Sequence, residues 1–260
     1  YARGSVSGVI YKDYVELSSL IIPDMEFGVA LSTDKPSPIY DGVLGLGIRM
    51  PNNVQYMPTI MDTLVAQRAI QQNVFGLSFE PTTPQGPVIG ELTFGVYDIL
   101  MCPCRHWSFE QFIQYGNQLL QPLSIGALDS GATLIYISHQ AFEVYSRSLQ
   151  GSRVAGCELL EIPQTSLSKM KSLYFHINDV SYEFTREAQL WPQRLNHLVR
   201  GRADRHYSVI NTIAGFASPG VSLPDVIFGY TFMKRFYTAY DRNDLMVGFA
   251  YTPSTYANVY

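Results

Sequence analysis

The chain has 260 residues and a net charge of -4, with 47% hydrophobic and 15% charged residues. This length is enough to bury a sizeable core in one large domain or two lobes, and the composition argues against disorder. The negative balance argues against a generic nucleic-acid partner, which requires a strongly basic face. No apolar run approaches the roughly 20 residues that a membrane-spanning helix needs.

The first half of the chain predicts short strands and one helix. Residues 1–17 alternate imperfectly, and Gly4 and Gly8 allow a sharp reversal, so we expect a β-hairpin. Residues 43–47 are apolar and interrupted by glycine, which predicts a buried strand. Residues 58–70 carry apolar side chains at helical spacing, with Pro58 in the first turn.

The second half predicts one helix and two hairpins. Residues 138–149 place apolar side chains on one helical face and end before a glycine. Residues 173–184 alternate on both sides of Asn178-Asp179, which is typical of a hairpin turn. Residues 236–251 predict a closing hairpin around a polar four-residue turn.

One carboxylate stands between two apolar runs in residues 125–137. The runs are typical of strands and Ser130-Gly131 of a tight turn, so Asp129 is predicted at the tip of a buried loop. An ionised carboxylate that is buried there costs several kcal/mol without compensation, which points to a chemical role. An ordinary Asp-Ser-Gly turn is the alternative, but exposed turns are rarely followed by a run as apolar as residues 133–137.

The segment around Asp129 resembles the motif of the pepsin-like aspartic proteases, apolar-apolar-Asp-Thr/Ser-Gly followed by an apolar strand. Four further segments match that family in order and approximate spacing: residues 1–8, 40–47, 226–234 and 239–242. The resemblance covers nearly the whole chain. It implies a mostly β, bilobal fold with a few short helices, with residues 1–97 as the remainder of the N-terminal lobe and residues 98–260 as the C-terminal lobe.

The resemblance also implies a site and a reaction. The chain would belong to an aspartic-type endopeptidase that hydrolyses peptide bonds with a water-activating carboxylate dyad, and Asp129 would be one of the two catalytic aspartates. Gly131, Ala132 and Thr133 would line the substrate cleft. The flap over the substrate would hold five further binding residues: Tyr1, Ala2, Arg3, Gly4 and Ser5. No cofactor and no metal are implied, and the partner is a peptide or protein substrate.

A dyad needs a second carboxylate, and the sequence contains a single Asp-Ser-Gly and no Asp-Thr-Gly. Asp129 precedes Gly229 by 100 residues, and Gly45 is the counterpart of Gly229 in the first lobe. Counting the same 100 residues back from Gly45 reaches a position about 55 residues upstream of Tyr1. We therefore expect the first catalytic aspartate upstream of this chain, which would be truncated at its flap and inactive alone.

Three cysteines cannot all pair with one another. Cys102 and Cys104 are too close in sequence to pair readily, and Cys157 lacks the later cysteine that the resembling family uses. A zinc site from Cys102, Cys104, Cys157 and His106 is the less favoured alternative, because the Cys-x-x-Cys spacing is absent. We interpret the three residues as packed free thiols.

A basic stretch, residues 194–206, carries four arginines and two histidines. It is typical of a solvated loop, which we favour, while an anion-binding site is the alternative. His-Glu-x-x-His and Gly-x-Ser-x-Gly motifs are absent from the sequence, which disfavours metallohydrolases and serine hydrolases.

Two other functions compete with the endopeptidase. An inactive homologue would keep the cleft and bind peptides, and it would lack a second motif upstream. A half-enzyme would pair two Asp129 residues across a symmetric dimer, but this chain is longer than one lobe. We expect a monomer when the chain is complete, and an extracellular (secreted) or vacuolar location by resemblance.

Overall fold

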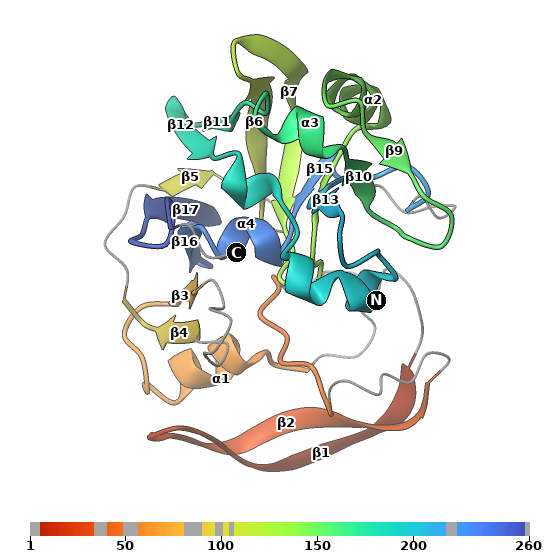
Figure 1. Cartoon of the computed structure of the whole chain (residues 1–260). Helices are drawn as coiled ribbons and strands as arrows, with labels where there is room; N and C mark the ends of the chain where they lie inside the picture. The colour runs from red at the N-terminus through yellow and green to blue at the C-terminus, as the bar shows by residue number, and fades with distance from the viewer. Residues whose placement is uncertain are drawn as a thin grey trace. The chain divides into compact units, whose positions relative to one another are not determined.

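The computed structural model describes residues 6–33, 41–48, 57–80, 90–96, 101–103, 107–216 and 223–257 (Figure 1). For residues 101–103 it describes the backbone alone. In these ranges the chain is mostly β with a few short helices, which confirms the predicted fold class. It divides into two compact units, residues 1–74 and 75–260. The predicted lobe boundary near Tyr97 falls outside the described residues and stays a prediction.

The first unit contains a long antiparallel hairpin of β1 (Val6–Leu17) and β2 (Leu20–Thr33). The chain reverses at Ser18, whose φ of 54° is left-handed. The predicted reversal does not occur at Gly8, which lies inside β1 at a register shift, and Gly4 lies outside the described residues. A Cβ at Gly8 would lie 2.0 Å from the Val29 carbonyl oxygen, so this glycine permits a close approach of the two backbones.

A short helix, α1 (Ile60–Ala66), completes the regular structure described in the first unit. Thr59 caps the helix in a capping box with Asp62. Pro58 therefore precedes the cap, and the prediction that it lies in the first turn is wrong. The helix contacts β2. Its buried face supplies Ile60, Met61 and Leu64.

Residues 43–47 do not form the buried strand predicted for them. They have no strand conformation, and Val43 and Leu44 are 60% and 45% exposed. A short apolar run becomes a strand only where another strand pairs with its backbone. The sheet described in the first unit contains β1 and β2, and residues 43–47 pair with neither of them.

The described residues of the second unit form three sheets (Figure 1). The largest has the order β12-β11-β6-β7-β15-β8-β14, in which the strands are Val180–Phe184, Leu173–Ile177, Ser108–Tyr115, Gln118–Leu128, Val226–Phe228, Ile135–Ile137 and Ile210–Thr212. The second has the order β4-β3-β16-β17-β5, with strands Gly90–Phe94, Val74–Phe79, Phe236–Asp241, Met246–Tyr251 and Met101–Pro103. The third pairs β13 (His206–Ser208), β10 (Leu160–Ile162) and β9 (Ser152–Arg153).

Short helices join these strands. Helix α2 (His139–Ser148) is capped by Ser138, contacts β7 and β14, and buries Phe142 and Tyr145 as predicted. The other helices are α3 (Gln164–Leu167), α4 (Tyr230–Met233) and the 3-10 turns η1 (Glu187–Gln189) and η2 (Gln193–Val199).

Both predicted hairpins of the second unit are confirmed. Strands β11 and β12 pair around Asn178 and Asp179, whose φ values of 47° and 63° are those of a tight left-handed turn. Strands β16 and β17 form the closing hairpin.

An aromatic core lies beneath the end of β15. Phe232 of α4 is fully buried, and its ring centre lies 4.7 Å from Phe228, 5.5 Å from Phe175 and 4.8 Å from Phe236. Edge-to-face and tilted contacts of this kind add stability beyond the burial of apolar area. The core therefore gives a rigid base to the loop that follows Phe228.

Candidate active site

Asp129 follows the last residue of β7, and a strand that lies about 100 residues later in the chain holds its backbone. Strand β15 lies between β7 and β8, parallel to the first and antiparallel to the second. The Asp129 amide donates to the Phe228 carbonyl at 3.0 Å. The turn from β7 to β8 therefore crosses the end of β15, and the position of Asp129 depends on both segments.

The Asp129 carboxylate is held from within its own turn. The Gly131 amide donates to Asp129 Oδ1 at 2.9 Å, and the Ala132 amide donates to the Asp129 carbonyl at 3.1 Å. Asp129 and Ser130 are both exposed. The prediction of a buried loop is thus wrong for this chain: water and one amide stabilise the charge, and no burial cost has to be offset.

Gly229 lets the chain pack directly against the carbonyl groups of the Asp129 turn. A Cβ at this position would lie 2.3 Å from the Leu134 carbonyl oxygen and 2.4 Å from that of Ala132. The Tyr230 amide donates to the Ala132 carbonyl at 2.7 Å, and the Thr231 amide to the Thr133 carbonyl at 3.1 Å. Only glycine fits at this close approach. The approach lets the first two amides of α4 hold the backbone of Ala132 and Thr133.

The structure brings together four of the nine predicted site residues: Asp129, Gly131, Ala132 and Thr133 lie in one turn. The five predicted flap residues, Tyr1, Ala2, Arg3, Gly4 and Ser5, lie outside the described residues. An exposed carboxylate with one oxygen held by an amide can accept a proton from water, because the other oxygen has no partner among the described side chains.

Sequence reasoning missed two residues that position the turn. Gly229 was recognised only as part of a motif. Asp225 was not singled out, yet its carboxylate accepts the Ile125 amide at 2.9 Å while its own amide donates to the Ile125 carbonyl at 2.8 Å. This reciprocal pair fixes β15 against β7. The 100-residue separation gives no local signal.

Metal binding finds no support where the structure describes the side chains, since no group of three or more metal-ligating residues occurs there. Cys157 is a buried free thiol, as predicted. The side chains of Cys102, Cys104 and His106 lie outside the described set, so the zinc alternative that includes them is not tested.

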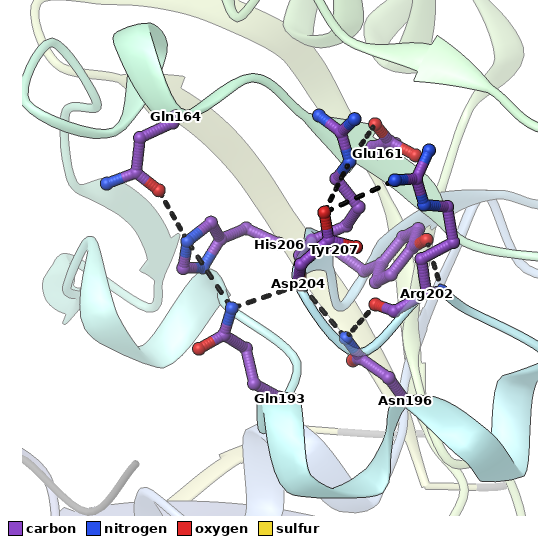
Figure 2. A network of polar contacts seen from close by, with 9 residues as sticks. Glu161, Gln164, Gln193, Asn196, Arg202, Asp204, His206 and Tyr207 are labelled. Carbon is purple, nitrogen blue, oxygen red and sulfur yellow. Dashed lines mark hydrogen bonds and ion pairs between the residues drawn. The ribbon is translucent and has the colours of Figure 1, made fainter.

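The basic stretch folds as an ordered polar network (Figure 2). Asn196 is 1% exposed, and its Nδ2 donates to the carbonyl groups of Arg202 at 2.7 Å and Arg205 at 2.9 Å. The Arg202 guanidinium lies 3.3 Å from Asp204, and that of Arg205 lies 3.7 Å from Glu161. These two arginines already face carboxylates, which favours the structural interpretation over an anion site.

His206 and Tyr207 connect this network to the neighbouring elements. His206 Nε2 lies 2.7 Å from Gln164 Oε1, and the Tyr207 hydroxyl accepts the Arg202 amide at 3.0 Å (Figure 2). Burial lowers the pKa of His206, so its imidazole is less readily charged than an ordinary histidine.

Comparison with known proteins agrees with this geometry. The family model described as eukaryotic aspartyl protease matches residues 1–103 and 105–252. Polyporopepsin from Irpex lacteus is 33% identical over 279 residues, which cover 99% of this chain and 81% of that protein. Cathepsin E-B from Xenopus laevis is 25% identical over 276 residues, covering 96% of this chain and 63% of that protein.

The crystal structure of the aspartic proteinase from Irpex lacteus superimposes with a TM-score of 0.91 at 32% identity, covering 100% of this chain and 82% of that one. The fold is therefore that of a pepsin-like aspartic protease. The chain belongs to the eukaryotic aspartyl protease family. In the described ranges, no helix is both long and apolar enough to cross a membrane.

Proposed function

We propose that the chain acts in an aspartic-type endopeptidase in which Asp129 supplies one of two catalytic carboxylates. The observation that carries the proposal is the position of Asp129 at the crossing of β7, β15 and β8, in a chain of the aspartyl protease family. Two neighbouring carboxylates share one proton, because like charges so close cannot both ionise easily. One carboxylate then activates water, and the protonated one donates to the peptide carbonyl oxygen.

The contacts of the Asp129 turn support this proposal. The Gly131 amide holds Oδ1, which leaves Oδ2 to bind water or to share the proton. Tyr230 and Thr231 hold the backbone of Ala132 and Thr133, so the residues proposed to line the cleft keep their positions when a substrate binds. An extended peptide would bind along this turn, with main-chain hydrogen bonds supplying much of its affinity, and the flap role of residues 1–5 is proposed from the family resemblance alone.

The second carboxylate is proposed to come from sequence upstream of Tyr1. Two facts support this: Asp-Ser-Gly occurs once in the 260 residues, and the internal correspondence between Gly45 and Gly229 points about 55 residues before Tyr1. Sequencing the 5′ end of the native transcript tests the proposal. We expect an Asp-Thr/Ser-Gly roughly 45 to 55 residues before Tyr1. A complete reading frame without that motif would overturn the dyad and favour the inactive, peptide-binding homologue.

Location and oligomeric state are proposed from the same resemblance. We expect a monomer that is secreted or vacuolar. Sedimentation of the product of the complete reading frame tests the first expectation, and fractionation of the source cells into medium, vacuole and cytosol tests the second. A stable dimer or a cytosolic protein would contradict them.

A further inference from the structure

A groove of about 620 Å³ lies on the second unit, apart from the Asp129 turn. We call it the β6–β11 groove. Its lining comes from β6, from β7 and from the tip of the β11–β12 hairpin: Phe109, Glu110, Phe112, Leu123, His176, Asn178 and Asp179. None of these residues belongs to the proposed catalytic site, so the groove calls for an explanation of its own.

An aromatic platform forms one part of the groove. Phe112 and His176 are direct partners in the ladder between β6 and β11. Their rings are stacked, with centres 4.2 Å apart and planes 6° from parallel. His176 Nε2 lies 2.9 Å from Gln114 Oε1, which fixes the imidazole plane. Because the two partly exposed rings face each other, a guanidinium would stack on the outer face of one of them.

The charges of the groove are negative only. Its lining includes the carboxylates of Glu110 and Asp179, both exposed, and includes no lysine or arginine. Neither carboxylate has an ion pair among the described side chains. Burial lowers the pKa of His176, so its imidazole is less readily charged and offsets the two carboxylates less than an ordinary histidine would.

Exposed apolar side chains continue the groove along β7. Leu123 lines it and is 66% exposed. Ile125, which pairs with Glu110 across the ladder, is 41% exposed. Carboxylates beside aromatic and aliphatic groups suit a partner that carries a flat cation on a polypeptide.

We propose that the β6–β11 groove binds an arginine side chain of an extended polypeptide partner. The guanidinium lies over the Phe112–His176 platform, and its N–H groups face Glu110 and Asp179. Neighbouring apolar residues of the partner pack on Leu123 and Ile125. The groove would thus act as a second contact for proteins that carry exposed arginine, and it goes beyond the proposed catalysis because it does not require Asp129.

Direct binding to the 260-residue chain tests the proposal. The probe is a fluorescein-labelled peptide, Gly-Leu-Arg-Gly-Leu-Arg-Gly, measured by polarisation at low salt. Matched peptides carry citrulline, which has the same shape without the charge, or lysine, which has the charge without the flat guanidinium. We expect saturable binding that weakens at high salt, about fivefold or greater preference over citrulline, and weaker binding of lysine.

A groove variant and a matched control variant show whether the peptide binds in the β6–β11 groove. Glu110→Gln with Asp179→Asn removes both charges, and asparagine tolerates the left-handed backbone at position 179. This variant should weaken binding of the arginine peptide about five- to tenfold, because exposed ion pairs contribute little each. Glu143→Gln, an exposed carboxylate on α2, should leave the affinity unchanged.

Four outcomes would overturn the proposal: no saturable binding, equal affinity for the citrulline peptide, equal affinity for the lysine peptide, or equal loss of affinity in the Glu143→Gln control. Sedimentation tests the other possible occupant of the groove, a second copy of this chain. Self-association that the Glu110→Gln/Asp179→Asn variant abolishes would assign the groove to a second copy of the chain instead.

Discussion

Lys234 is a buried cation whose removal should stabilise the second unit. It follows α4, is 8% exposed, and its Nζ lies 5.4 Å from the centre of the Tyr230 ring. Burial, together with repulsion from Arg235 and Arg194, lowers the pKa of Lys234 from 10.5 to about 8. The folded protein therefore holds this proton less tightly than the unfolded chain does.

The sign and size of the effect follow from proton linkage. Because the pKa is lower in the folded state, the unfolded chain binds more protons between pH 8 and 10.5, and stability rises with pH across this window. The difference between the two pKa values of Lys234, 10.5 when unfolded and about 8 when folded, sets the free-energy cost of burying its charge at lower pH to at most about 3 kcal/mol. The cation–π contact with Tyr230 is worth up to about 2 kcal/mol and offsets part of what Lys234→Met would gain.

We expect Lys234→Met to raise the free energy of unfolding by about 1 to 3 kcal/mol at pH 6 to 7, with the gain fading as the pH approaches 10.5. Urea unfolding from pH 6 to 10 measures this. Both tryptophans, Trp107 and Trp191, lie in the second unit, so their fluorescence reports the correct transition. The exposed Lys169→Met serves as the control and should change stability by less than about 0.5 kcal/mol. A variant less stable than wild type at pH 6 to 7, or a gain that is independent of pH, would refute the reasoning.

Three further predictions concern single contacts in the structure. Gly229→Ala should destabilise the second unit by about 2 to 4 kcal/mol in urea unfolding, because its Cβ meets two carbonyl oxygens; a loss under about 0.5 kcal/mol would contradict the close-approach argument. Tyr145→Phe should cost about 1 to 2 kcal/mol in the same assay, since the buried hydroxyl donates to Gln189 Oε1; a loss under 0.3 kcal/mol would be inconsistent with that bond. Asn196→Ala should speed amide exchange in residues 200–205, because it removes bonds to two carbonyl groups there, and unchanged exchange would show that the loop does not depend on them.

Local patterns predicted the elements whose partners are close in sequence. The hairpin at residues 173–184 and helix α2 were predicted because strand alternation, a turn pair and the helical spacing of apolar side chains each act within a few residues. The β1–β2 hairpin was mislocated for the same reason. Gly4 and Gly8 suggested a turn, whereas the reversal uses Ser18, and serine is a weaker turn signal than glycine.

Long-range contacts were beyond the reach of these patterns. The insertion of β15 between β7 and β8 joins segments about 100 residues apart, and no local feature of either one reveals it. The exposure of Asp129 also escaped prediction, because apolar flanks indicate buried strands but do not determine whether the turn between them is covered. The family motif nevertheless singled out Asp129, because a motif encodes its structural context, and its catalytic role stays a proposal.

Cleavage of peptides by the product of the complete reading frame tests the central claim most directly. Three forms should be compared on a quenched fluorescent peptide library at acidic pH: wild type, Asp129→Asn, and the exposed control Asp244→Asn. If Asp129 is one of the two catalytic carboxylates, the wild type and Asp244→Asn cleave equally well, and Asp129→Asn loses about a thousandfold or more in kcat/KM. Cleavage by Asp129→Asn at the wild-type rate would contradict the assignment.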